Sequence, residues 1–278
     1  MTDIICSIIT FNPEIQLLKK NIESIQNQVD KIIIIDNFSS NVDEIRAIVI
    51  EGDKLVLIQN KKNLGIAAAL NQAFEYAKLN NYNWVLTLDQ DSVCPNSFVN
   101  RLHYLALQED RVGIMAPTII DRNVGKIGHI VPDCNKYKEV RTCITSGALT
   151  NVSAWKEIGK FDEKMFIDSV DFEFCYRLRK YKYKVLQTNK VKLSHSIGDA
   201  KVRKFIFIKF KDAEHNAFRD FYIAQNNIYY PKKHKLILHL IRGNFRNLRL
   251  LFITLIYQKD KLKKVSSIIK GWINGYKI

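Results

Sequence analysis

The stretch Trp84-Val85-Leu86-Thr87-Leu88-Asp89-Gln90-Asp91-Ser92 decides the fold, because an apolar run ends there in two carboxylates one residue apart. Side chains alternate faces along a strand, so Asp89 and Asp91 are expected to point the same way. Two carboxylates beyond the carboxyl end of a buried strand suit Mg²⁺ or Mn²⁺, with water and phosphate as the other ligands. The alternative is an acidic turn that caps the next segment, since Asp-x-Asp is common in surface turns. The position of the pair, at the end of a repeating strand pattern, favours the metal site.

Apolar strands alternate with helical segments over the first 90 residues. Strands are predicted at 4–10, 31–35, 55–58 and 84–88, and helices at 14–28, 42–50 and 66–79. Such alternation predicts an α/β fold built on a doubly wound, mostly parallel sheet. Ala67, Ala68 and Ala69 would let the third helix pack closely on that sheet.

Three polar clusters fall at the carboxyl ends of these strands, on one rim of the predicted sheet. They are Thr10-Phe11-Asn12, Asp36-Asn37 and Asp89-Gln90-Asp91. Open α/β sheets bind nucleotides at this rim. The chain contains neither G-x-G-x-x-G nor G-x-x-x-x-G-K-[ST], so a dinucleotide-binding fingerprint and a P-loop are excluded.

The composition fits one large core, or a core plus an appendage. The 278 residues are 47% hydrophobic, and because no run of 18 or more apolar residues exists, no membrane-spanning helix is expected. The first residues lack the basic and apolar regions of a signal peptide. Five cysteines without a Cys-x-x-Cys are expected to be reduced thiols of a cytosolic protein, and not zinc ligands or a disulfide framework.

Charge divides the chain into two parts. Residues 201–278 hold 18 Lys and Arg against 4 Asp and Glu, whereas residues 1–200 hold 25 against 24. We therefore expect a catalytic domain over 1–200 and a basic, helical C-terminal region over 201–278. The basic region needs an anionic partner, which is a membrane surface, a nucleic acid or a phosphorylated substrate.

Four motifs resemble, in order and spacing, those of the inverting nucleotide-sugar glycosyltransferases of family 2, which have the GT-A fold. The motifs are Ile8-Ile9-Thr10-Phe11-Asn12, Ile35-Asp36-Asn37-Phe38-Ser39-Ser40, Asn63-Leu64-Gly65-Ile66-Ala67 and Asp89-Gln90-Asp91. The resemblance implies that Thr10 and Asp36 hold a pyrimidine base, that Asp89 meets the ribose and that Asp91 meets the divalent metal. The other donor-binding residues that it implies are Phe11, Asn12, Asn37, Asn63, Gly65, Ala67 and Gln90.

In this interpretation the middle of the chain binds the acceptor. A short strand is predicted at 112–117 and a loop or hairpin at 121–137. Thr145, Ser146 and Gly147 are small and polar, as expected where the backbone passes close to a sugar. A turn that enters the segment 152–158 explains these residues equally well.

The block at 161–177 resembles the family's block in which an acidic pair precedes a helix and an arginine. The family's catalytic acid falls on Asp171, with Val170 in place of the usual glutamate and Asp168 three residues earlier, as in the rhamnosyltransferase branch. A carboxylate there would take the proton of a sugar hydroxyl as the anomeric bond forms. Asp171 is the predicted base and Asp168 the second choice, and the two share a face if the segment is helical. Alternatively, both only offset the helix dipole.

Later segments extend the resemblance to bacterial rhamnosyltransferases. His195 follows a predicted strand at 184–188 and matches a late histidine that lies near the metal and diphosphate in the family. The resemblance implies that it contacts a phosphate or joins Asp91 and Asp89 as a metal ligand. A structural or exposed histidine is the alternative. Arg219 lies in a segment similar to Arg-x-Tyr-Tyr-x-x-Arg-Asn, which implies contact with the donor diphosphate or the acceptor. The segment 234–257 is typical of a basic amphipathic helix that lies on an anionic membrane, or of one packed on the catalytic domain.

These features predict an inverting glycosyltransferase of bacterial surface-polysaccharide assembly. We expect it to move a sugar, first choice L-rhamnose from dTDP-β-L-rhamnose, to a lipid-linked saccharide, as a peripheral protein on the cytoplasmic face of the membrane. Glucose, galactose or galactofuranose from UDP donors stay open, as does a homo-oligomer. A nucleotidyltransferase would need a glycine-rich, basic phosphate loop, which the first strand end lacks. A nucleic-acid partner is not expected, because the tail carries no recognisable binding motif.

Overall fold

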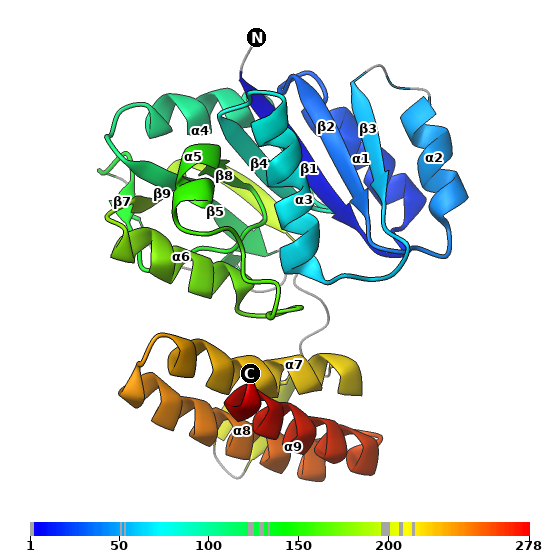
Figure 1. Cartoon of the computed structure of the whole chain (residues 1–278), viewed down its shortest axis with the longest axis vertical. Coiled ribbons are helices and arrows are strands. Elements are labelled where there is room, and N and C mark those ends of the chain that lie inside the picture. The colour runs from blue at the N-terminus through cyan, green and yellow to red at the C-terminus, as the bar shows by residue number, and fades with distance from the viewer. Residues whose placement is uncertain are drawn as a thin grey trace. The chain divides into compact units, whose positions relative to one another are not determined.

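The computed structural model describes residues 3–50, 52, 54–121, 125–127, 131–132, 134–195, 201–205, 208–212 and 215–278. The chain divides into two compact units (Figure 1). The N-terminal unit consists of Met1–Lys164 and Val170–Ser196, and the C-terminal unit of Met165–Ser169 and Ile197–Ile278. The short segment Met165–Ser169, in the middle of the sequence, therefore belongs to the same unit as the C-terminal residues.

A mixed sheet forms the centre of the N-terminal unit. Its strands are β1 (Ile4–Thr10), β2 (Lys31–Asp36), β3 (Leu55–Gln59), β4 (Trp84–Asp89), β5 (Val112–Asp121), β6 (Gly125–Ile127), β7 (Lys138–Glu139), β8 (Ala148–Asn151) and β9 (Lys184–His195). Over the described residues the order is β3-β2-β1-β4-β8-β5-β9-β7, with β6 paired to β5. Strands β1 to β4, β5 and β9 run in one direction, because β8 is antiparallel to both β4 and β5. The predicted mostly parallel sheet is confirmed.

Helices cover both faces of this sheet. They are α1 (Ile15–Ile25), α2 (Val42–Ile50), α3 (Ile66–Leu79), α4 (Phe98–Ala106), α5 (Val152–Glu157) and α6 (Val170–Lys180). Helices α1, α2 and α4 share one apolar cluster with the alternate β1 residues Ile4, Cys6 and Ile8. Helices α3, α5 and α6 lie on the opposite face (Figure 1). Burial on both faces is why β1 is apolar at nearly every position.

Most predicted boundaries hold, and the exceptions follow from tertiary pairing. Helices α2 and α3 match the predicted ranges, whereas α1 ends at Ile25, three residues before the predicted end. Strands β5 and β9 run beyond the predicted 112–117 and 184–188, because they pair in parallel across two register shifts as far as Asp121 and His195. Part of the predicted loop at 121–137 lies outside the described residues.

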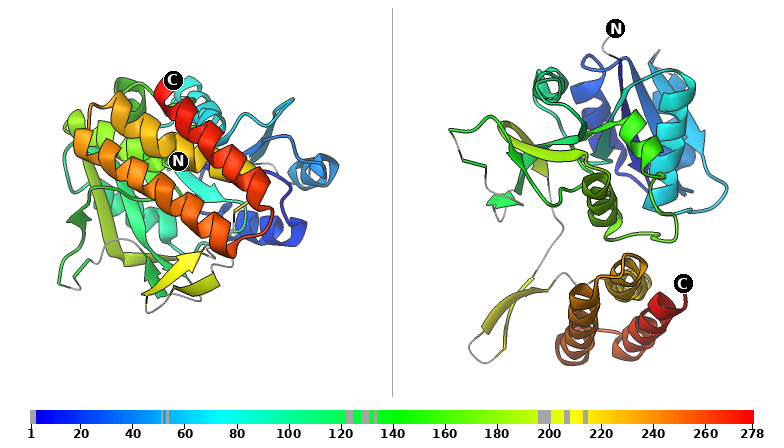
Figure 2. Two further views of the ribbon diagram at one scale, coloured as in Figure 1. Left: turned by 90° about the horizontal axis from the view of Figure 1, so that it is seen from below. Right: turned by 60° about the vertical axis from the view of Figure 1, so that its left-hand side comes forward.

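The C-terminal unit contains three helices and a hairpin among its described residues. Helices α7 (Ala217–Lys233), α8 (Ile237–Tyr257) and α9 (Lys261–Lys277) pack side by side (Figure 2). Strands β10 (Lys201–Phe205) and β11 (Ile208–Asp212) pair antiparallel, so the prediction of helices from residue 201 onward is wrong for this hairpin. Its Val, Ile and Phe residues favour strands over helices.

Two glycines allow the helices to approach closely. A Cβ atom at Gly243 would lie 1.9 Å from the carbonyl oxygen of Asn227, and one at Gly271 would lie 2.0 Å from that of Phe221. No helix in the described ranges is both long enough and apolar enough to span a membrane.

Candidate active site

The parallel strands β1, β2 and β4 bring the predicted donor residues to one rim. Thr10 is paired with Asp36 in the sheet register, and Ile9 with Asp89. The Thr10 hydroxyl donates to Oδ1 of Asp36 at 3.1 Å, and the Ser39 amide donates to Oδ2 at 3.0 Å. Both Thr10 and Asp36 are fully buried. The carboxylate of Asp36 therefore fixes the loop that follows β2.

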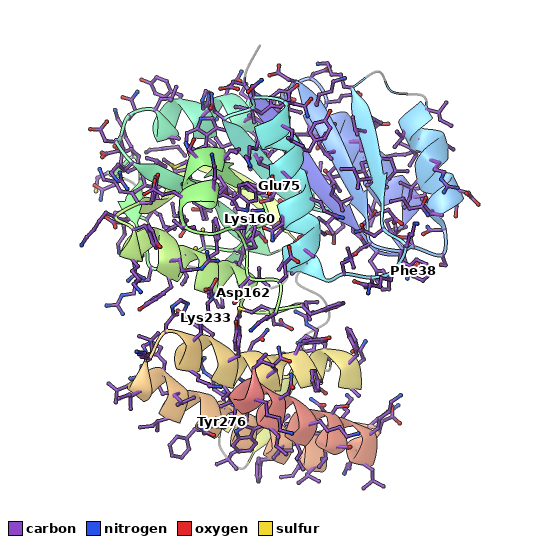
Figure 3. All side chains as sticks on the ribbon, viewed as in Figure 1. Phe38, Glu75, Lys160, Asp162, Lys233 and Tyr276 are labelled. Carbon is purple, nitrogen blue, oxygen red and sulfur yellow. The ribbon has the colours of Figure 1, made fainter. Side chains whose placement is uncertain are left out.

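Exposed aromatic rings lie on the loops at the same rim. Phe11 is 49% exposed and Phe38 is 57% exposed. Figure 3 labels Phe38. The Phe11 amide donates to Oε1 of Gln90 at 2.9 Å, and the Asn12 amide donates to the Ser39 hydroxyl at 2.8 Å. These bonds tie the ends of β1, β2 and β4 together and leave both rings exposed.

Asn37 joins the end of β2 to the start of α3. Its Oδ1 accepts from the Leu64 amide at 2.9 Å, and its Nδ2 donates to the Gly65 carbonyl at 3.2 Å. The Gly65 amide donates to Oδ1 of Asn63 at 2.9 Å. Gly65 has φ +83°, in the left-handed region that favours glycine, and Ala67 is buried in the first turn of α3. The residues of the third predicted motif thus belong to one hydrogen-bonded corner with Asn37.

Asp89 is the last residue of the fourth strand, and Asp91 lies beyond the end of that strand. Strand β4 ends at Asp89, and Gln90 and Asp91 form a turn in which the Ser92 amide donates to the Asp89 carbonyl at 3.1 Å. Strand alternation therefore does not apply to Asp91, which lies beyond the end of β4. Asp91 is exposed and Asp89 is partly exposed.

The predicted acceptor residues adjoin this turn. The hydroxyls of Ser146 and Ser92 are 3.1 Å apart, the Thr87 hydroxyl donates to the Thr145 carbonyl, and the Gly147 amide donates to the Thr87 carbonyl at 2.7 Å. Gly147 has φ +76°, and a Cβ atom there would lie 2.7 Å from a methyl group of Leu193. The segment enters β8, and then α5, so the turn interpretation describes its backbone correctly.

The same segment reaches α6, which carries Asp171. The thiols of Cys143 and Cys175 are 3.8 Å apart, and Cys175 lies one helical turn after Asp171. The hydrogen bond with Cys175, burial and the Asp171 carboxylate together raise the pKa of the Cys143 thiol well above its usual value. The stretch from Cys143 to Gly147 thus connects the turn that holds Asp91 to the helix that holds Asp171.

Asp168 lies outside the helix that carries Asp171, so the condition for a shared helix face is not met. Helix α6 begins at Val170, and Asp168 and Ser169 have φ +65° and +60°. Within the C-terminal unit, Nε and Nη2 of Arg219 donate to the two carboxylate oxygens of Asp168 at 3.1 and 2.9 Å. The structure therefore pairs the second-choice base with the arginine that was predicted to meet the donor.

A buried ion pair on α6 was not predicted. Glu173 is fully buried and accepts three hydrogen bonds of 2.7–2.9 Å from the guanidinium of Arg177. Arg177 also donates to the Ile158 carbonyl at 2.7 Å. The signal in the sequence was the Glu-x-x-x-Arg spacing, which places the two side chains on one helix face.

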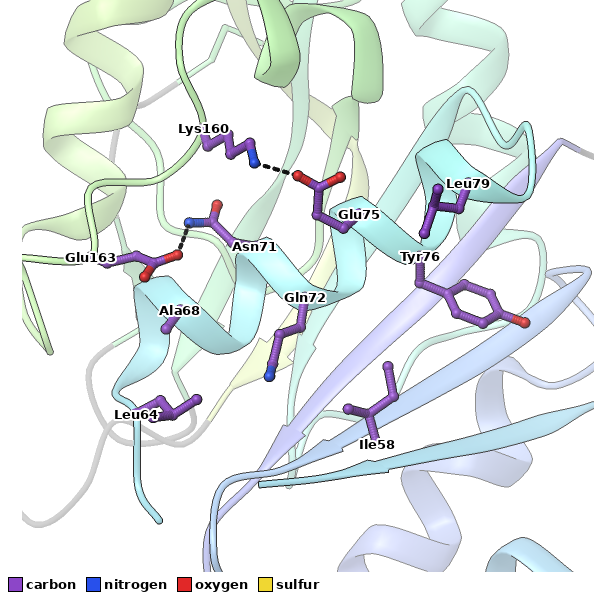
Figure 4. Close-up of a pocket in the computed structure, with 10 residues that line it drawn as sticks. All are labelled: Ile58, Leu64, Ala68, Asn71, Gln72, Glu75, Tyr76, Leu79, Lys160 and Glu163. Carbon is purple, nitrogen blue, oxygen red and sulfur yellow. Dashed lines mark hydrogen bonds and ion pairs between the residues drawn. The ribbon is translucent and has the colours of Figure 1, made fainter. Parts of the chain in front are cut away.

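A cavity of about 440 Å³ lies elsewhere on the N-terminal unit, beside α3 (Figure 4). None of the predicted site residues lines it. Two side-chain contacts lie along one side of this cavity. Lys160 forms an ion pair with Glu75, and Asn71 donates a hydrogen bond of 2.8 Å to Glu163. The lining residues are Ile58, Leu64, Ala68, Asn71, Gln72, Glu75, Tyr76, Leu79, Lys160 and Glu163.

The backbone of His195 ends β9, and its side chain lies outside the described residues. Within the described ranges no group of three or more His, Cys, Asp or Glu side chains is arranged to hold a metal ion. Any ion bound by Asp91 and Asp89 would therefore take further ligands from water, substrate or residues that the structure does not describe.

The chain is similar to known glycosyltransferases. The dTDP-rhamnosyl transferase RfbF of Shigella flexneri is 27% identical over 99% of this chain and 95% of its own length. The fold resembles that of the mannosyltransferase PcManGT from Pyrobaculum calidifontis in complex with GDP-Man and Mn²⁺, with a TM-score of 0.58 and 13% identity over 99% of this chain and 87% of that one. It also resembles GalNAc-T7 with UDP, GalNAc and Mn²⁺, with a TM-score of 0.61 and 12% identity over 87% of this chain and 54% of that one.

The model of the family described as "Glycosyl transferase family 2" matches residues 6–159. This range includes most of β1, all of β2 to β8, and the rim with the predicted donor residues. The sheet order, the polar rim and this match agree, and the chain belongs to glycosyl transferase family 2 and is a glycosyltransferase of the GT-A fold.

Proposed function

We propose that this glycosyltransferase moves L-rhamnose from dTDP-β-L-rhamnose, with inversion, to a lipid-linked or polysaccharide acceptor in bacterial cell-surface glycan synthesis. The observation that carries the choice of donor is the similarity of 99% of the chain to a relative named as a dTDP-rhamnosyl transferase. A UDP-linked glucose, galactose or galactofuranose is the second candidate, because UDP and dTDP both carry a pyrimidine base.

Asp171 is the proposed base of this reaction. It would take the proton of the acceptor hydroxyl while that oxygen bonds to the anomeric carbon and the bond to the diphosphate breaks on the opposite side. Attack opposite the leaving group inverts the anomeric centre and needs no covalent intermediate. The bidentate pairing of Asp168 with Arg219 supports Asp171 over Asp168, because both oxygens of the Asp168 carboxylate already accept hydrogen bonds from the guanidinium.

We infer that Mg²⁺ or Mn²⁺ binds at the turn after β4. The donor atoms fit, since the carboxylate oxygens of Asp91 and Asp89 are of the kind these ions prefer, and both residues are at least partly exposed. Two protein ligands leave coordination positions for water and the donor diphosphate. When bound, the ion would offset the charge that builds on the leaving diphosphate.

A panel of nucleotide sugars tests the donor proposal. With Mn²⁺ present, dTDP-β-L-rhamnose is expected to raise the melting temperature more than UDP-glucose, UDP-galactose or UDP-galactofuranose, because a ligand that binds only the folded state stabilises it. Release of dTDP on addition of lipid-linked saccharides from bacterial membranes would establish transfer. A shift with a UDP-sugar alone would select the second candidate, and no shift with any donor would contradict both.

Replacing Asp91 by Ala is expected to remove the metal-dependent part of this thermal shift. The variant loses one carboxylate ligand from an exposed turn, so its fold is expected to be unchanged. Removal of Mn²⁺ with EDTA should abolish the shift for the native protein and change nothing further for the variant. Equal shifts for both proteins, with and without EDTA, would reject the metal role of Asp91.

The C-terminal unit is proposed to contact the inner face of the membrane through α8. Phe245 and Leu248 are 66% and 52% exposed, and Ile241 and Phe252 lie within about 60° of them around the helix. The opposite side of α8 is buried, since Asn247 donates to the Ala224 carbonyl of α7 at 3.0 Å. Arginines at 242, 246 and 249 follow one edge of the apolar stripe.

Charge favours anionic lipid over a second copy of the chain as the partner of this stripe. Residues 234–278 contain 10 Lys and Arg residues and a single acid, Asp260. Two such faces brought together would repel each other, whereas a surface of anionic headgroups attracts each cation by about 1 kcal/mol. This attraction and the exposed stripe support a peripheral position on the membrane.

The variant Arg242→Gln/Arg246→Gln/Arg249→Gln is expected to bind phosphatidylglycerol vesicles about 100-fold more weakly than the native protein, because it loses three contacts of about 1 kcal/mol. The matched control Arg101→Gln/Lys136→Gln/Lys138→Gln removes the same charge from exposed positions of the N-terminal unit and should bind nearly as well as the native protein. Equal losses for both variants in vesicle sedimentation would mean that net charge alone drives binding.

A further inference from the structure

The segment Met165–Ser169 immediately precedes the helix that carries the proposed base, yet it belongs to the C-terminal unit. Its side chains and carbonyls contact four residues of α7. These are Phe218, Arg219, Tyr222 and Asn226, which recur along one side of the helix.

Each contact holds a different group of the segment. The Phe166 ring stacks on Tyr222, with centroids 4.8 Å apart and planes at 16°, and it meets the edge of Phe218 at 5.3 Å. Arg219 holds the Asp168 carboxylate through two hydrogen bonds. The side-chain amide of Asn226 donates to the carbonyls of both Ile167 and Asp168, each at 2.8 Å, and Asn226 is 1% exposed.

These contacts surround an unfavourable backbone conformation. Asp168 and Ser169 are both left-handed, with φ +65° and +60°, and neither is glycine. The next residue, Val170, begins α6, and Asp171 is its second residue. Asn226 binds the carbonyls of Ile167 and of Asp168, which is the first left-handed residue. This side-chain amide therefore stabilises the turn that leads into α6.

We propose that Asn226, assisted by Arg219, is a positioning residue for Asp171, and that α7 holds the turn before α6 in the conformation that aims the base. The inference rests on the proposed role of Asp171. Neither residue touches the reacting atoms in this account. A base displaced by about 1 Å loses roughly 100-fold in rate, so a turn released from α7 would reduce turnover without weakening donor binding.

Replacing Asn226 by Ala in the full chain tests this proposal. We expect kcat for transfer from dTDP-β-L-rhamnose to fall about 100-fold, with the donor KM changed less than twofold, because Asn226 is not among the predicted donor residues. The matched control is Asn247→Ala, which removes a buried asparagine that joins α8 to α7 but none of the contacts to residues 165–169. It should lower the melting temperature similarly and leave kcat within twofold.

Arg219→Gln is a second variant, since Arg219 is partly exposed and its loss endangers the fold less. It should lower kcat about tenfold, and Arg219→Lys should recover part of that loss. Equal kcat losses for Asn226→Ala and Asn247→Ala, or native kcat for both Asn226→Ala and Arg219→Gln, would overturn the proposal.

A double-variant cycle separates this proposal from the function on which it rests. If Asn226 acts through Asp171, Asn226→Ala should not reduce the residual rate of Asp171→Asn any further. A further 100-fold loss in that background would refute the positioning role while leaving Asp171 as the base. Full activity of Asp171→Asn alone would refute the base.

Discussion

Replacing Asp171 by Asn is expected to reduce kcat for transfer by about 10²- to 10⁴-fold, which is the usual contribution of a general base. The substitution removes the proton acceptor but keeps the shape of the side chain. The Asp171 carboxylate accepts a hydrogen bond from the Phe172 amide at 2.9 Å, and the amide oxygen of Asn can accept the same bond. Folding and donor binding should therefore be retained, so KM and the thermal shift with donor are expected to stay near the native values.

Asp168→Asn is the matched control for this prediction. It also removes one carboxylate, but that carboxylate is paired with Arg219. We expect a partial loss of kcat, because the turn before α6 is loosened while the base stays in place. The reverse result, an inactive Asp168→Asn protein with an active Asp171→Asn protein, would assign the base to Asp168.

Replacing Glu173 by Ala is expected to destabilise the N-terminal unit by about 3–5 kcal/mol, because it leaves a buried guanidinium without its counter-charge. Arg177 has a side chain only 9% exposed, and Glu173 supplies three of the hydrogen bonds that it makes. Domains are stable by about 5–15 kcal/mol in total, so this loss is a large fraction of the free energy of unfolding. Urea unfolding followed by circular dichroism measures it.

The double variant Glu173→Leu/Arg177→Met is the control for this second prediction. It removes both charges and replaces them with apolar groups, which leaves the Ile158 carbonyl without the hydrogen bond from Arg177. We expect it to cost about 1–3 kcal/mol, less than the single variant. A single variant that loses under 1 kcal/mol would show that the pair contributes little to stability.

The predicted rim is where sequence and structure agree most closely. The ends of β1, β2 and β4 bring Thr10, Asp36 and Asp89 together, because strand polarity and sheet order follow from the alternation of apolar runs and helices. Predictions that depended on the exact residue at which a strand ends or a helix begins were less accurate. Strand β4 stops at Asp89 and α6 starts at Val170, so Asp91 lies outside the strand and Asp168 outside the helix.

The sequence by itself determined the sheet, the rim and the charge of the tail, because hydrophobic period, turn residues and composition act locally along the chain. Only the tertiary structure decided how individual carboxylates are paired. Asp168 meets Arg219 from 51 residues away, and Asn226 reaches the Ile167 carbonyl from 59 residues away. Such partners are selected by the packing of helices, and no local pattern encodes which of two acids three residues apart receives the arginine.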